Sequence, residues 1–208
     1  MTENKTNKTY ETNKTKPNTS YPICPIGPIG PIRLIPPHGG YRKLISYQTA
    51  SIIYDLTVIF CKKFLDYKSR TNDQMVQAAR SGVQNIAEGS QTSGTSKKTE
   101  LKLVGVARAS LEELLRDYED FLRQRGLSLW DKNDPKTRTA RNLSYLSNRS
   151  SSSYLSYLDH PESAANCLIC LLHQANYLLD KQLQRLEDDF MKNGGFTERL
   201  YTIRKSLR

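Results

Sequence analysis

Between residues 74 and 125, apolar positions recur at three- and four-residue steps in two runs, with a short polar stretch between them. Apolar residues with this spacing lie on one face of an α-helix, so each run predicts an amphipathic helix with one buried face. The first run consists of Met75, Val76, Ala79, Val83 and Ile86. The second and longer run consists of Leu101, Val104, Ala107, Leu111, Leu114, Leu115, Tyr118 and Leu122. The sequence therefore predicts a helical hairpin against which other segments pack.

The polar stretch from Gly89 to Ser96 predicts the turn of this hairpin. Gly89 can adopt the left-handed conformation that ends many helices, and Ser96 can accept a hydrogen bond from the free N–H groups that open the next one. Gly82, inside the first helix, costs about 1 kcal/mol relative to alanine, which predicts that a neighbouring helix approaches closely. Gly105, near Ala107 and Ala109, offers the matching narrow surface on the second helix.

Another apolar face precedes the hairpin, from near Leu44 to about Tyr67, and predicts a further helix. The turn that follows offers Thr71 or Asn72 as the cap of the hairpin's first helix, with Asp73 near the positive end of that helix. The face consists of Ile45, Ile52, Ile53, Leu56, Ile59, Phe60 and Phe64.

After the hairpin, Gly126 ends the second helix, and Asp134 followed by Pro135 supplies a cap and a proline at the first helical position. This pair predicts an accessory helix from Pro135 to about Leu146. The serine-rich residues 144–156 predict a loop or a loosely ordered insertion.

The strongest apolar period runs from near Pro161 to Lys192 and predicts the longest helix. Gly194 and Gly195 stop it, and Thr197 caps a short final helix. Short turns make consecutive helices antiparallel neighbours. The predicted fold class is therefore all-α, an up-down antiparallel four-helix bundle with a C-terminal helical extension.

The first 40 residues show no helical period. Asn-Lys-Thr recurs three times, and a Pro-Ile-Gly unit then repeats. Proline removes backbone donors and favours extended conformations, so this segment predicts a disordered low-complexity tail. The predicted organisation is a tail (1–40), the first three bundle helices (41–127), an accessory helix and serine-rich insertion (128–160), and the fourth bundle helix with a short C-terminal "suffix" helix (161–208).

The formal net charge is +10, from 31 Lys and Arg against 21 Asp and Glu. This balance favours polyanionic partners, of which nucleic acid is the commonest, although the charges could also only face water. No stretch approaches the roughly 18 apolar residues of a membrane helix, and the first residues lack the apolar core of a signal peptide. We therefore expect a cytoplasmic protein without a membrane partner.

Two of the four cysteines, Cys167 and Cys170, form a CxxC in an apolar helical stretch, without a second pair. This context predicts small core residues rather than a metal or redox site. The sequence also lacks Walker, GxSxG and GxGxxG patterns, so we expect neither a cofactor nor an enzyme.

The predicted topology gathers basic residues at the two ends of the bundle. At one end are Lys62, Lys63, Lys68, Arg70, Arg123 and Arg125, and at the other are Arg42, Lys43, Lys97, Lys98 and Lys102. Lys97 and Lys98 stand at a helix N-terminus, where their charges add to exposed backbone donors and predict a phosphate contact. The tyrosines of the serine-rich segment could stack on single-stranded bases or could be packing residues. They are Tyr145, Tyr154 and Tyr157.

Asn85 and Glu88 stand on the last turn before Gly89. A structural role is the first hypothesis, in which Glu88 accepts from the N–H groups that open the next helix or pairs with Arg80 or Arg108. General acid–base catalysis would need a second titratable group and a pocket, and the sequence indicates neither.

Three runs carry a resemblance to a known family: residues 85–90 (NIAEGS), 96–101 (SKKTEL) and 109–114 (ASLEEL). They resemble the bacterial four-helix bundle family typified by proteins encoded in intervening sequences of large-subunit ribosomal RNA genes, to which the accessory variability protein of diversity-generating retroelements is related. The resemblance covers about 41–127, and residues 166–204 are similar to a subgroup with a C-terminal suffix domain. It implies a ring-shaped homo-oligomer, commonly a pentamer, and an association with RNA or a reverse transcriptase.

The function that these observations predict is a noncatalytic, ring-forming helical bundle. It would bind nucleic acid, RNA ahead of DNA, or a nucleic-acid enzyme, through its basic surfaces. The alternative is a protein-interaction scaffold that makes no direct contact with nucleic acid.

Overall fold

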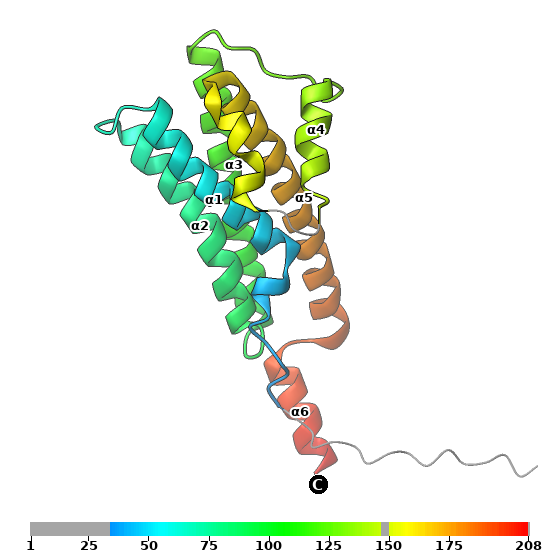
Figure 1. Ribbon diagram of the computed structural model, residues 1–208. Coiled ribbons are helices and arrows are strands. Elements are labelled where there is room, and N and C mark those ends of the chain that lie inside the picture. The colour runs from blue at the N-terminus through cyan, green and yellow to red at the C-terminus, as the bar shows by residue number, and fades with distance from the viewer. Residues whose placement is uncertain (1–33, 147–149, 208) are drawn as a thin grey trace, which may run out of the picture. The chain divides into compact units, whose positions relative to one another are not determined.

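The computed structural model describes residues 34–146 and 150–207 (Figure 1). Every regular element within these two ranges is helical. The α-helices are α1 (Ile45–Phe64), α2 (Arg70–Thr92), α3 (Lys97–Gln124), α4 (Pro135–Leu143), α5 (Pro161–Asn193) and α6 (Phe196–Ser206), and the 3-10 helices are η1 (Tyr41–Lys43) and η2 (Ser151–Asp159). The predicted all-α class is confirmed. Most of the predicted tail, residues 1–33, lies outside the described residues.

One core joins α1, α2, α3 and α5. Helix α2 packs against α3, α3 packs against α5, and α1 packs against both α2 and α5. The two apolar runs of the hairpin supply much of this core, and only Val76 and Leu101 of those runs are half-buried. Helix α5 contributes to it from Ala164 to Leu179, and α1 contributes to it from Ala50 to Cys61. The predicted apolar faces of the hairpin helices are therefore confirmed.

Gly82 lets α2 and α3 approach closely. A Cβ built at this position would come within 2.5 Å of Leu111 Cδ2, so any side chain would clash with the core. The predicted close approach at Gly82 is confirmed, and α3 is the helix that approaches, but Gly105 does not supply the contact. Gly105 meets nothing within 4 Å of its own ideal Cβ position, which shows that it faces open space.

Local chemistry sets several helix ends as predicted. The Ser96 hydroxyl accepts from the Thr99 N–H at the start of α3, and the Asp134 carboxylate accepts from the Lys136 N–H at the start of α4. Gly126 and Gly194 take positive φ angles of 64° and 65° just beyond α3 and α5.

Three other predicted helix ends are wrong. Helix α2 continues past Gly89 to Thr92, and Thr71 and Asn72 lie inside its first turn instead of capping it. Helix α6 begins before Thr197, and its first turn is held by Glu198, whose carboxylate accepts from the Gly195 N–H.

The serine-rich segment is more ordered than predicted. Residues 151–159 form η2, which packs against α1 and α5 and buries Tyr154 and Leu158. Burying these two large side chains offsets the weak helix propensity of the serines. Residues 147–149 of the predicted loop lie outside the described ranges.

The chain that enters η1 lies against the turn between α2 and α3. The Gly39 N–H donates to the Ser90 carbonyl at 3.0 Å, and His38 and Ile35 lie within about 3 Å of where a Gly94 side chain would begin. Residues 34–40, assigned above to the tail, therefore contact the helical core. Among the described helices, none is long and apolar enough to span a bilayer.

Candidate nucleic-acid interface

The basic residues near the α1–α2 turn lie together with the end of α3. Arg125 Nη2 donates to the Phe64 carbonyl at 2.8 Å, so the last residue of α1 and the residue that follows α3 are neighbours. We call this region the α1/α2 end, and it comprises Lys62, Lys63, Lys68, Arg70, Arg123 and Arg125. The predicted gathering of these residues at one end agrees with this contact.

Most cations of the α1/α2 end lack a carboxylate partner. Arg123 pairs with Asp120 at 2.7 Å, and its charge is therefore neutralised locally. Lys63 Nζ donates to the Leu158 carbonyl at 3.1 Å, and Arg125 stacks 4.1 Å from the centre of the Phe121 ring. Within residues 34–146 and 150–207, no ion pair involves Lys62, Lys63, Lys68, Arg70 or Arg125.

The backbone adds to the positive potential of the α1/α2 end. Helix α2 begins at Arg70, and its Ser69 cap position provides no side-chain hydrogen bond to the first N–H groups. Unpaired N–H groups and the helix dipole both favour an anion at such a terminus. Asp66 and Asp73 lie in the same stretch of chain and offset part of the charge.

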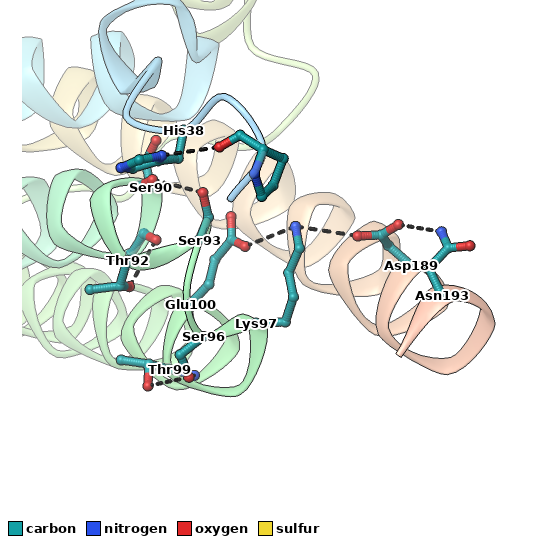
Figure 2. A network of polar contacts seen from close by, with 12 residues as sticks. His38, Ser90, Thr92, Ser93, Ser96, Lys97, Thr99, Glu100, Asp189 and Asn193 are labelled. Atoms are coloured by element: carbon teal, nitrogen blue, oxygen red, sulfur yellow. Dashed lines mark hydrogen bonds and ion pairs between the residues drawn. The ribbon is translucent and has the colours of Figure 1, made fainter. Parts of the chain in front are cut away.

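The opposite end gives a different result for Lys97. Its Nζ lies 3.3 Å from Glu100 Oε2 and 3.3 Å from Asp189 Oδ2, so it bridges the start of α3 and the end of α5 (Figure 2). Its side chain is only 18% exposed. A lysine held between two carboxylates has little charge left for phosphate, so Lys97 fits a structural role better than the predicted phosphate contact.

The two carboxylates beside Lys97 respond differently to their surroundings. Burial raises the pKa of Glu100 above its ordinary value, and the nearby Lys97 charge offsets part of that rise. Hydrogen bonds from Asn193 and then from Lys97 hold the pKa of Asp189 below its ordinary value. Glu100 is thus the member of the cluster that most needs a cation.

The other predicted cations at the Lys97 end are exposed. Lys98 and Lys102 extend from α3, while Arg42 and Lys43 belong to η1, which packs against α2. The Arg42 guanidinium lies 5.7 Å from the centre of the Tyr41 ring.

Asn85, Glu88 and Gly89 occupy three different environments on α2. Asn85 Nδ2 donates to the Ser81 carbonyl at 2.9 Å and to the Ser81 hydroxyl at 3.1 Å. The hydroxyls of Ser81 and of Ser110 on α3 are hydrogen-bonded to each other at 2.9 Å. Gly89 is buried against α3, with Glu100, Leu103 and Val104 at ordinary contact distance from an ideal Cβ.

Glu88 is exposed and has no hydrogen-bond or ion-pair partner in the described part of the chain. Arg108, one of its predicted partners, instead pairs with Glu112 and Asp180. Asn85 thus has the predicted structural role, as part of a polar link between two helices, and the pairing predicted for Glu88 is wrong.

Of the two CxxC residues on α5, Cys167 is buried in the apolar core, and Cys170 is half-buried beside Thr137 and Arg141. Burial raises the pKa of the Cys167 thiol strongly and that of the Cys170 thiol less, and both cysteines are free. A raised thiol pKa disfavours the thiolate that metal binding and redox chemistry need. No group of three potential metal ligands occurs among the described residues.

A groove that the sequence did not predict lies beside α5, where α4, the loop before it and the start of α1 meet. Its volume is about 1010 Å³, and we call it the α4/α5 groove. Five large apolar side chains that are exposed to solvent line it together: Ile45, Leu129, Tyr145, Leu146 and Tyr177. Polar side chains that line it include Asn166, His173 and Gln174.

A sequence signal for this groove exists on α5. Asn166, Cys170, Gln174 and Tyr177 recur at three- and four-residue steps, offset from the core stripe, and therefore form a second face of the helix. Of the three tyrosines considered for stacking, Tyr145 lines the groove and is 77% exposed. Tyr154 is fully buried, so stacking by Tyr154 is excluded.

Comparisons of the chain with protein-family models, with curated proteins and with solved structures give no significant match.

Proposed function

We propose that this chain is a noncatalytic helical protein that binds nucleic acid, RNA ahead of DNA, through the α1/α2 end. One observation carries the proposal. Five cations gather there, and none of them has a carboxylate partner within the described residues. Such cations can release counterions from a phosphate backbone, which is the main source of affinity for nucleic acid. The five are Lys62, Lys63, Lys68, Arg70 and Arg125.

The proposed scaffold is an up-down antiparallel four-helix bundle of α1, α2, α3 and α5. Two pairs of contacts support antiparallel packing. Gly82 contacts Leu111, whereas Gly89, later in α2, lies beside the earlier Val104 of α3. Ser46 near the start of α1 bonds Gln182 late in α5, whereas Lys63 near the end of α1 bonds Leu158, just before α5 begins.

The proposed assembly is a cytoplasmic homo-oligomer, a pentamer by the family resemblance, that acts on nucleic acid or with a nucleic-acid enzyme. A ring would repeat the α1/α2 end several times and convert a weak basic patch into an avid one. The molar mass of the purified protein, measured with and without nuclease treatment, tests this part directly. A monomer in both samples would contradict it.

A salt titration of RNA and DNA binding tests the interface. The triple variant Lys62→Gln, Lys68→Gln, Arg70→Gln should bind RNA at least about 10-fold more weakly at low salt. Its plot of log affinity against log salt should be shallower by about 2, because each phosphate contact contributes about 0.7 to 0.9 to the slope.

The matched control removes three positive charges elsewhere, with Arg185→Gln, Lys192→Gln and Arg204→Gln on α5 and α6. Its affinity should fall much less, because these residues lie outside the α1/α2 end. If both triple variants lost the same affinity for RNA, binding would depend only on net charge, and the assignment to the α1/α2 end would be overturned. If no RNA or DNA binds even at low salt, the proposal fails, and a protein-interaction role becomes the better hypothesis.

A further inference from the structure

The α4/α5 groove has the size and lining of a binding site. Its volume of about 1010 Å³ is at the upper end of the range for small-molecule sites. Three aromatic side chains line it, Trp130 from the loop before α4, Tyr145 after α4 and Tyr177 on α5. The two tyrosines are 77% and 62% exposed, and the Lys181 ammonium lies over the Tyr177 ring, 5.9 Å from its centre.

The charges of the groove do not favour a phosphate. Lys132 and Arg141 line it together with Glu119 and Asp131, so the formal charges balance. None of these four side chains belongs to an ion pair with a described residue. Affinity for a ligand must therefore come from stacking and hydrogen bonds, and it should depend only weakly on salt.

Three buried polar atoms in the lining residues lack hydrogen-bond partners among the described residues. They are the indole Nε1 of Trp130, a donor, the amide Oε1 of Gln174, an acceptor, and the hydroxyl of Thr137, which lies beside Cys170. The Gln174 amide nitrogen makes only a long bond of 3.4 Å to the Arg141 carbonyl. Buried polar groups are almost always paired in folded proteins, so unpaired ones in a groove indicate that a ligand completes them.

The Gln174 amide suggests which ligand. A carboxamide presents a donor and an acceptor side by side, and this pair matches the edge of adenine, which also carries an adjacent donor and acceptor. A nucleobase would further supply two π faces for the exposed tyrosines. A phosphate or an aliphatic chain would satisfy at most one of these features.

We infer that the α4/α5 groove binds an unpaired nucleobase, which stacks on its exposed tyrosines and hydrogen-bonds to the Gln174 amide. The inference rests on the proposed function and deepens it, because it makes single-stranded RNA the form that is bound. Phosphates would then contact the α1/α2 end and a base would enter the groove. A free adenine nucleotide carries the same base, and the experiment separates these two sources.

Trp130 provides the measurement, because it is the only tryptophan in the chain and it lines the groove. Its fluorescence would be followed during titration with AMP, ribose 5-phosphate, a single-stranded oligoadenylate and a duplex RNA of the same length. AMP and the oligoadenylate should quench the emission saturably. The affinity for AMP should change less than about 2-fold between about 50 and 200 mM salt, whereas the affinity for the oligoadenylate should fall more steeply because its phosphates also contact the α1/α2 end. Ribose 5-phosphate and the duplex should leave it unchanged.

The affinities of the two quenching ligands identify the source of the base. An oligoadenylate that binds at least about 10-fold more tightly than AMP identifies RNA, because phosphate contacts add to base binding. If AMP binds as tightly as the oligoadenylate, RNA is overturned as the source of the base. Absence of quenching by both overturns the base site.

Two variants test the groove without changing its reporter. Gln174→Leu and Tyr177→Ala should each weaken AMP binding at least about 10-fold, whereas Tyr201→Ala, at an exposed position of α6, should not. Circular dichroism would verify that each variant folds, and Tyr177 is exposed enough for its loss to be tolerated. AMP quenching with unchanged affinity in both groove variants overturns the inference.

The same titrations separate the inference from the proposed function. The Lys62, Lys68 and Arg70 triple variant should lose salt-dependent RNA binding but keep AMP quenching. RNA binding without any base-dependent quenching would contradict the groove alone. AMP quenching by a protein that binds no RNA would contradict the α1/α2 end alone.

Discussion

Gly82 of α2 and Leu111 of α3 are in such close contact that a Cβ at position 82 would stand 2.5 Å from Leu111 Cδ2 and 2.8 Å from its Cγ. Leu111 is fully buried and cannot move away without disturbing the core. Overpacking of this kind costs about 1 to 3 kcal/mol, whereas the gain in helix propensity from glycine to alanine is about 1 kcal/mol. Gly82→Ala should therefore lower the free energy of unfolding, measured by urea denaturation.

Gly105→Ala is the matched control for Gly82→Ala. It also replaces a glycine inside a helix, but the new methyl group would meet nothing within 4 Å. We expect it to stabilise the protein by up to about 1 kcal/mol through helix propensity alone. If both alanine variants changed the free energy of unfolding in the same direction, the contact with Leu111 would not decide the outcome.

Tyr118 and Thr57 form a hydrogen bond between α3 and α1 in the centre of the core. The Tyr118 hydroxyl donates to Thr57 Oγ1 at 3.0 Å, and both residues are fully buried. Burial is the main cause that raises the pKa of Tyr118 well above its ordinary value, so the phenol remains a donor across the neutral range. Tyr118→Phe leaves the Thr57 hydroxyl without this donor and should cost about 1 to 3 kcal/mol.

The double variant Tyr118→Phe, Thr57→Val isolates that hydrogen bond. Removing both polar groups at once should cost less than the sum of the two single losses, because no unpaired hydroxyl remains. Chemical denaturation of the four proteins of the cycle measures the difference. Strict additivity would mean that the contact contributes nothing beyond packing.

Asp117 makes the stability of the protein depend on pH. Burial, with the charges of Glu113 and Asp120 adding to it, raises the pKa of Asp117 from 3.8 to about 6. The folded state therefore binds a proton that the unfolded state has already released, and stability falls as the pH rises from about 4 to about 6. Asp117→Asn removes this loss and should stabilise the protein by about 1 kcal/mol above pH 6, since the carboxylate is partly exposed and its charge is screened.

The Asp117 prediction is checked by the dependence of thermal unfolding on pH. The stability gained by Asp117→Asn should disappear below about pH 4, where the Asp117 carboxyl group of the unmutated protein is protonated in both the folded and the unfolded state. Asp55→Asn, at an exposed position of α1, removes the same charge and serves as the control. A gain that persists unchanged at low pH would show that it has a cause other than ionisation.

The sequence predicted the elements whose ends depend on neighbouring residues. Ser96 and Asp134 cap their helices through contacts two or three residues away, and such contacts follow from local chemistry. The prediction that Gly89 ends a helix is wrong because the need for a glycine at this position comes from a distant part of the sequence. It lies inside α2 where α3 comes close, and a local pattern cannot distinguish a glycine that ends a helix from one that makes room for another.

The candidate sites depended more on tertiary contacts than the helices did. Charge and spacing placed Lys97 with the phosphate-binding residues, because Asp189 is distant in sequence and only the fold brings it to 3.3 Å. The α4/α5 groove depends on how α4 lies on α5, which no periodicity specifies. By contrast, the contact between Arg125 and Phe64 joins two segments that the predicted alternation of helix directions places at the same end, so it could be anticipated.

The bridge from Lys97 to Glu100 and Asp189 should hold the end of α5 against the start of α3. Lys97→Met leaves the Glu100 carboxylate, whose side chain is only 10% exposed, without its cation. A buried charge without a partner costs about 1 to 3 kcal/mol at neutral pH. Hydrogen exchange should also become faster in the last turns of α5, which lose their ionic link to α3.

The dependence on pH distinguishes this bridge from ordinary loss of packing. Burial already raises the pKa of Glu100, and removing Lys97 raises that pKa further, so the variant's deficit should grow as the pH rises above the ordinary value of 4.5 and shrink below it. Adding Glu100→Gln to Lys97→Met should restore most of the lost stability, because a neutral amide needs no cation. A deficit that is equal at pH 4 and pH 7, and that Glu100→Gln does not relieve, would mean that the Lys97 side chain acts through its apolar stem alone.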